Sequence, residues 1–173
     1  MPTCNTKGTV TVLGIDPGSQ RTGWGVVRET SGVLQLVDCG VVRTASAGKE
    51  FSDRLARIYH ELSAIVARLK PDEAAIEQVF TAQNAASALK LGQARGVAVA
   101  ACAAYGLVIR DYEPTLVKKS LVGTGRAEKE QVSFMVQRLL NVKNANWALD
   151  TSDALAVAVC HLTVRRFAAL AGK

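Results

Sequence analysis

The sequence has few cysteines and histidines, and those present are not grouped. They are scattered along the chain: Cys4, Cys39, Cys102, Cys160, His60 and His161. No CxxC pair occurs, so a zinc cluster is not expected. Cys102 and Cys160 lie in stretches rich in alanine and valine, where an unpaired cysteine behaves as a small core hydrophobe. Such cysteines fit a reducing compartment, so we expect a cytoplasmic protein.

The sequence also lacks a leader and a long uninterrupted apolar run. The N-terminal stretch MPTCNTKGT has no apolar core of the kind found in signal peptides. The stretch GVAVAACAAYGLVI is short for a membrane span and is broken by Gly106. No repeat or low-complexity linker divides the chain, so residues 1–173 are predicted to form one domain with no membrane partner.

The balance of charge is basic. The chain has 21 Lys and Arg against 15 Asp and Glu, a formal net charge of +6. This excess favours a polyanionic partner such as nucleic acid, with a generic basic surface as the alternative.

The pattern of apolar residues predicts a mixed α/β sheet with helices on its faces. Three strands joined by short turns should form antiparallel hairpins, and strands and helices then alternate. Ser52 is a possible cap for the first helix, which Pro71 ends. The expected strands are 9–15, 23–29, 33–44, 73–80 and 107–114, and the expected helices are 51–70, 84–106, 128–141 and 151–170. This order gives a five-stranded sheet flanked by helices.

Two carboxylates end or interrupt apolar strands. Asp16 follows TVTVLGI and precedes Pro17-Gly18, where an Asp can also simply begin a turn. Glu77 lies inside the apolar stretch AAIEQVF, where an ionised group is costly unless it is paired. Its partner is either a distant arginine or a metal ion.

Asp150 and Asp153 lie three residues apart at the start of the last predicted helix, and therefore on one helix face. Either could instead cap the helix or complement its dipole, although Asp153 lies further inside it. Four gathered acids would need a cation, and a set of carboxylates suits Mg²⁺ or Mn²⁺. Two such ions can drive hydrolysis of a phosphodiester.

Five segments together resemble the bacterial RuvC family of Holliday junction resolvases. They are LGIDPGSQRTGWGV, IEQVF, NAASALKLGQARGVA, GRAEKEQV and DTSDALAVA, in the family's order along almost the whole chain. The resemblance implies a ribonuclease H-like fold and a homodimer. It also implies an endodeoxyribonuclease of recombination and repair that cuts four-way DNA junctions by paired nicks.

The resemblance assigns the family's acidic tetrad to Asp16, Glu77, Asp150 and Asp153, both as catalytic residues and as ligands of two Mg²⁺ ions that Mn²⁺ can replace. Some relatives have histidine at the third position, where this sequence has Asp150. The branch-migration proteins RuvA and RuvB are implied as partners.

The same resemblance assigns DNA contacts to Phe80, Lys118 and Lys129. Phe80 would stack on a base unpaired at the crossover, and its alternative is a place in the core. Lys118 and Lys129 would contact phosphate near the cut, and their alternative is ordinary solvation. Solvation alone explains Lys129 poorly, because a cation at a helix start opposes the helix dipole.

Small residues recur every fourth position in the helix expected over 84–106. Ala88, Gly92, Gly96 and Ala100 form this small-residue ridge, which permits close approach of another backbone. Either the sheet or a second copy of the chain could pack against it.

Three other functions are compatible with parts of the sequence. LGIDPGS resembles the first phosphate loop of actin-like ATPases, but those proteins need two lobes and this chain supplies one. A binding protein without nuclease activity would not need four acids. A ribonuclease H-like RNA-processing nuclease is the nearest rival, because the same metal chemistry cuts RNA.

Overall fold

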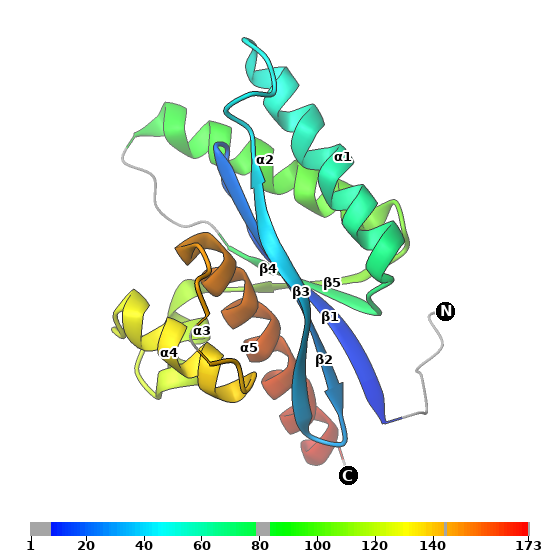
Figure 1. Cartoon of the computed structure of the whole chain (residues 1–173), viewed down its shortest axis with the longest axis vertical. Helices are drawn as coiled ribbons and strands as arrows, with labels where there is room; N and C mark the ends of the chain where they lie inside the picture. The colour runs from blue at the N-terminus through cyan, green and yellow to red at the C-terminus, as the bar shows by residue number, and fades with distance from the viewer. Residues whose placement is uncertain (1–7, 79–83, 144, 173) are drawn as a thin grey trace.

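A computed structural model describes residues 8–78, 84–143 and 145–172 of the chain (Figure 1). Its centre is a five-stranded sheet in the order β3-β2-β1-β4-β5. β1 is antiparallel to β2, and β2 to β3, whereas β4 is parallel to β1 and β5 to β4. The strands are β1 (Thr9–Asp16), β2 (Arg21–Thr30), β3 (Val33–Arg43), β4 (Glu73–Glu77) and β5 (Val108–Tyr112). The predicted mixed five-stranded sheet is confirmed.

Helices cover both faces of the sheet. α1 (Phe51–Leu69) and α2 (Ala85–Ala103) pack together on one face. α3 (Pro114–Val122), α4 (Lys129–Leu139) and α5 (Leu149–Ala171) lie on the other face (Figure 1). Side chains alternate along β1, so Leu13 and Ile15 join the α1/α2 core whereas Val12 joins the α5 core. By the same alternation, Asp16 lies on the α5 face.

Three details differ from the sequence-based predictions. α3 was not predicted; it begins with Pro114, whose missing N–H costs nothing in a first helical turn. α1 has Glu50, not Ser52, as its N-cap, and the Asp53 side chain accepts the Glu50 backbone N–H at 3.2 Å. α2 ends at Ala103, and Gly106 follows it with a positive φ of 73°.

α5 passes the length and hydropathy criteria for a membrane span, a property not predicted from the sequence. Half of its apolar window is buried inside the domain. Leu155, Val157 and Leu162 of this helix are almost wholly buried, as is Cys160. Packing between the sheet and the α3/α4 pair therefore accounts for the apolar composition of α5. Cys102 is also fully buried, so the predicted core positions of Cys102 and Cys160 are confirmed.

Two glycines let α5 lie directly on the sheet at the end where β1 finishes. A Cβ at Gly14 would overlap the backbone carbonyl oxygen of Ala154, and one at Gly23 would overlap that of Asp150. Gly23 pairs with Asp16 in the β1/β2 register. The missing side chains therefore bring the first turns of α5 close to the strand end that carries Asp16.

We expect Gly14→Ala to destabilise the protein, because the added methyl group displaces the backbone of α5. Overpacking of this kind costs about 1–3 kcal/mol, which urea unfolding would measure. Gly8→Ala is the matched control, because only the Ser31 hydroxyl, 3.8 Å away, would be near its Cβ. Equal stability of the two variants would contradict the close approach of α5 to β1.

Candidate active site

The carboxyl groups of Asp16 and Glu77 meet because they end neighbouring parallel strands. Ile15 pairs with Ile76 in the β1/β4 register, and each acid is the next residue on its strand. Both acids lie on the α5 face, since Glu77 shares a strand face with Ala75 of the α5 core. Strand pairing thus brings together two acids that are far apart in the sequence.

Asp153 and two lysines complete this part of the site. Asp153 lies in α5, Lys118 in α3 and Lys129 at the first position of α4. Together with Glu77 they line a cavity of about 200 Å³, whose apolar wall includes Val117, Val132 and Ala156. The structure therefore gathers three of the four predicted acids with both predicted lysines.

The shared site shifts the pKa values of two acids. The pKa of Asp16 rises from 3.8 to about 8, first through burial, then through the charges of Glu77 and Asp153 and a hydrogen bond with Glu77. The pKa of Glu77 also rises, through burial and then the charge of Asp153, although Lys129 and Lys118 oppose this. Without a further cation, Asp16 is the acid that keeps a proton near neutral pH.

Lys129 is paired with Asp153, although its side chain is 59% exposed. Its Nζ donates to Oδ2 of Asp153 at 2.8 Å, and the pKa of Lys129 is raised first by this hydrogen bond. The ion pair accounts for a cation at the start of α4, where the helix dipole is unfavourable. Within the site, this ammonium group supplies part of the missing positive charge.

Asp150 lies in the first turn of α5, but its side chain is directed elsewhere. Oδ2 of Asp150 lies 3.9 Å from a guanidinium nitrogen of Arg21. As the side chains lie, the described residues contain no group of three or more His, Cys, Asp or Glu placed to hold a metal ion. The acids must therefore change rotamer to converge on an ion, and Asp150 would have to leave Arg21.

The donor set nevertheless suits a divalent cation. It consists of carboxylates, the preferred ligands of Mg²⁺ and Mn²⁺, and nitrogen and sulfur ligands are absent from the described cavity lining. The pKa values of Asp16 and Glu77 are raised first by burial and then by the negative charges of neighbouring acids. A bound cation would relieve this repulsion. Phe80, the remaining predicted site residue, lies outside the described residues.

Sequence reasoning missed a buried polar network behind the site. Nε2 of His161 lies 2.7 Å from Glu73, and Nδ1 lies 2.9 Å from the hydroxyl of Tyr112. Arg165 also donates to Glu73, at 3.0 Å. These contacts fit a neutral imidazole that donates from Nε2 and accepts at Nδ1. Tyr112 pairs with Glu77 in the β4/β5 register, so the network fixes the strand beside the site.

The sequence offered little signal for this network, because His161 is isolated in it and its partners are distant. Burial lowers the pKa of His161, although hydrogen bonding to Glu73 opposes the shift. For Glu73, burial raises the pKa, but hydrogen bonds from His161 and Arg165 outweigh it and the pKa is lowered.

Comparison with known proteins connects this site with one family. The family described as "Crossover junction endodeoxyribonuclease RuvC" matches residues 12–161. A protein of that name from Oleidesulfovibrio alaskensis is 67% identical over 162 residues, covering 94% of this chain and 96% of the relative.

Solved structures agree with the sequence matches. Thermus thermophilus RuvC in complex with a Holliday junction substrate has a TM-score of 0.85 and 32% identity, covering 92% of this chain and 96% of that one. The yeast mitochondrial Holliday junction resolvase Ydc2 shares the fold, with a TM-score of 0.67 at 12% identity, covering 90% of this chain and 78% of its own.

We expect His161 to make stability depend on pH. Its folded-state pKa lies below its ordinary value of 6.5, so the unfolded chain binds a proton more readily as the pH falls. The stability that His161 contributes is therefore present above about pH 6.5 and is lost below it. The difference in unfolding free energy between the wild type and His161→Gln should shrink between about pH 7.5 and about pH 5.

Two comparisons make this measurement specific. Asp16, with its raised pKa, changes stability in the opposite direction, but it does so in both proteins and cancels in the difference. His60→Gln, which replaces an exposed histidine of α1, is the matched control. A wild-type to His161→Gln difference that stays constant with pH would contradict a buried neutral His161.

Proposed function

The chain belongs to the RuvC family of crossover junction endodeoxyribonucleases, and from this we propose that it resolves four-way DNA junctions during recombination and repair. One observation carries the proposal beyond the family match: Asp16, Glu77 and Asp153 converge from two strands and a helix beside two lysines. Raised pKa values such as those of Asp16 and Glu77 are typical of acids in a catalytic site. The cut would be hydrolysis of one phosphodiester on each of two opposing strands.

We propose that Asp16, Glu77, Asp150 and Asp153 hold divalent metal, with Asp16 between the ions. RuvC family nucleases depend on divalent metal, and we infer two Mg²⁺ ions per subunit, with Mn²⁺ as a substitute. Bound there, Mg²⁺ would activate the attacking water and stabilise the leaving oxygen. The mutual repulsion of the acids supports this assignment, because it favours uptake of a cation.

The lysines would position the DNA. Lys118 and Lys129 line the same cavity as Glu77 and Asp153, so a phosphate close to the acids is within reach of both. In this proposal Lys129 exchanges its carboxylate partner for a phosphate oxygen when the acids hold metal. Phe80 would stack on an unpaired base at the crossover, from the chain segment that follows β4.

The other candidate functions are not favoured. The resemblance to actin-like ATPases is limited to one short loop, whereas the RuvC match extends over residues 12–161. A ribonuclease H-like enzyme acting on RNA shares the fold and chemistry, but the family match and the structure with a bound junction are specific to four-way DNA.

We propose that the enzyme acts as a cytoplasmic homodimer, because two symmetric nicks require two sites. The small-residue ridge supports this proposal. A Cβ at Gly92 or Gly96 would meet no described atom within 4 Å, and Ala88 and Ala100 are exposed. Of the two partners expected for the ridge, the sheet is therefore excluded, since Ala94, Ala98 and Ala101 of α2 are the residues buried against it. RuvA and RuvB are proposed as further partners.

Asp16→Asn should abolish cutting of a four-way junction with Mg²⁺ while leaving junction binding near normal. Affinity comes mainly from basic contacts to phosphate, whereas the acids act on the chemical step. Loss of metal stabilisation worth several kcal/mol corresponds to a rate loss of about a thousandfold. Glu61→Gln, at an exposed acid of α1, is the control.

The same assay should include a linear duplex and an RNA–DNA hybrid under identical Mg²⁺. Selective cutting of the junction supports the resolvase, whereas preference for the hybrid favours the RNA-processing alternative. Full cutting by Asp16→Asn would overturn the metal mechanism.

Gly96→Leu should weaken dimerisation and paired nicking without unfolding the protein, because the side chain has room in one subunit and none at a close contact between two ridges. Sedimentation velocity at micromolar concentration measures the association. Ala168→Leu places the same bulky side chain at an exposed position of α5 and should leave the association unchanged. A strictly monomeric wild-type protein that still makes paired nicks would rule out this architecture.

A further inference from the structure

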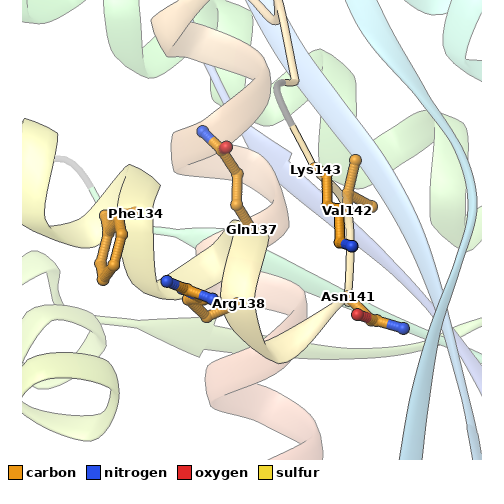
Figure 2. A pocket seen from close by; sticks show the side chains of 6 residues that line it. All are labelled: Phe134, Gln137, Arg138, Asn141, Val142 and Lys143. Carbon is orange, nitrogen blue, oxygen red and sulfur yellow. The ribbon is translucent and has the colours of Figure 1, made fainter.

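A second basic groove lies at the far end of α4 from the acids. Its volume is about 350 Å³, and it is formed by the last turns of α4 and the segment that follows. Figure 2 shows its lining side chains: Phe134, Gln137, Arg138, Asn141, Val142 and Lys143. We refer to these six residues as the α4 groove.

The α4 groove presents hydrogen-bond donors and positive charge. Arg138 and Lys143 are exposed, and neither forms a salt bridge with any carboxylate in the described part of the chain. Among the described residues the lining contains no acid, and Gln137 and Asn141 add amide donors. The dipole of α4 accounts for one basic residue in its last turn, but not for Lys143 beyond it.

An exposed aromatic ring orients the arginine. The Phe134 side chain is 55% exposed, and the Arg138 guanidinium carbon lies 5.1 Å from the centre of its ring. The two residues are one helical turn apart and lie side by side in Figure 2. Stacking on the ring limits the rotamers of Arg138 and leaves its N–H groups free for a ligand.

We propose that the α4 groove binds the phosphate backbone of a junction arm that leaves the active site along α4. This inference rests on the proposed function, because it assigns a second contact to the same DNA. α4 begins at Lys129, beside Asp153, and Arg138 is nine residues further on, about 14 Å along the helix axis. One DNA strand advances 3.4 Å per nucleotide, so the contact would fall about four nucleotides from the cut.

A duplex arm is favoured over other ligands for a physical reason. The free groups of the groove are N–H donors of Arg, Lys and amide side chains, and phosphate oxygens accept from such donors. The Phe134 ring already stacks with Arg138 and so does not need a base. A duplex arm, whose bases are stacked on one another, therefore suits the groove. Arg138 and Lys143 near the end of α4, together with Lys129 at its start, would set the direction of the DNA arm relative to the acids.

The test compares junction binding by Arg138→Gln/Lys143→Gln with that of the wild type, without divalent ions so that no cutting occurs. Loss of two phosphate contacts should reduce the slope of log affinity against log salt concentration by about 2. When the salt concentration rises from about 50 to about 200 mM, the loss of junction affinity should therefore be roughly tenfold smaller for the variant than for the wild type. The control variant Arg28→Gln/Lys70→Asn also removes two positive charges, but at the end of the sheet away from Asp16. It should leave the salt slope unchanged.

The first part of a second measurement uses only the wild type and so does not depend on the folding of the variant. Neutral methylphosphonate linkages are placed one at a time along an arm, and those about four nucleotides from the cut should weaken binding by the wild type. The same linkages should have no further effect on Arg138→Gln/Lys143→Gln. An unchanged salt slope, or linkages that weaken both proteins equally, would overturn the proposal and leave an acidic protein partner as the candidate ligand. Junction cutting by the wild type tests the proposed function separately, because it does not need the groove.

Discussion

The rest of the proposed active site depends on one constraint, the repulsion among carboxylates at the carboxyl ends of β1 and β4. Asp16 and Glu77 end adjacent parallel strands on the same face, and α5 brings Asp153 over them. Without metal, this charge is balanced by a proton on Asp16, by the Lys129 ammonium and by Lys118. In the proposed mechanism, a divalent cation would replace the Asp16 proton and the contact of Lys129 with Asp153.

The surrounding fold holds the acids together against this repulsion. Gly14 and Gly23 let α5 lie directly on β1 and β2, and the Tyr112–His161–Glu73 contacts join β4 and β5 to the same helix. Most residues of α5 between Thr151 and Leu162 are buried, and this packing fixes the position of Asp153 relative to the sheet. The acids therefore approach one another through rigid elements rather than loops, as precise positioning of a site requires.

The strands could be predicted from the sequence because their signals are local, and Asp16 and Glu77 stood out as candidate site residues for the same reason. The turn residues after Asp16, and the apolar strand around Glu77, are visible within a few positions. The rotamer of Asp150 in α5 was not predictable, since it depends on Arg21 of β2. α3 has nine residues, fewer than a periodicity window needs, and was missed. α2 is apolar on several sides, so only the structure showed that its small-residue ridge faces outward. Long-range contacts decided the rotamer of Asp150 and the outward orientation of the ridge.

A crystal structure of the wild-type protein soaked with Mn²⁺ would test the central claim most directly, because anomalous scattering identifies the ion without reference to activity. The account predicts anomalous peaks between Asp16, Glu77 and Asp153, with Asp150 turned away from Arg21 and the Lys129 ammonium moved off Asp153. Crystals in which Mn²⁺ is absent from these acids, with Lys129 still bonded to Asp153, would contradict it.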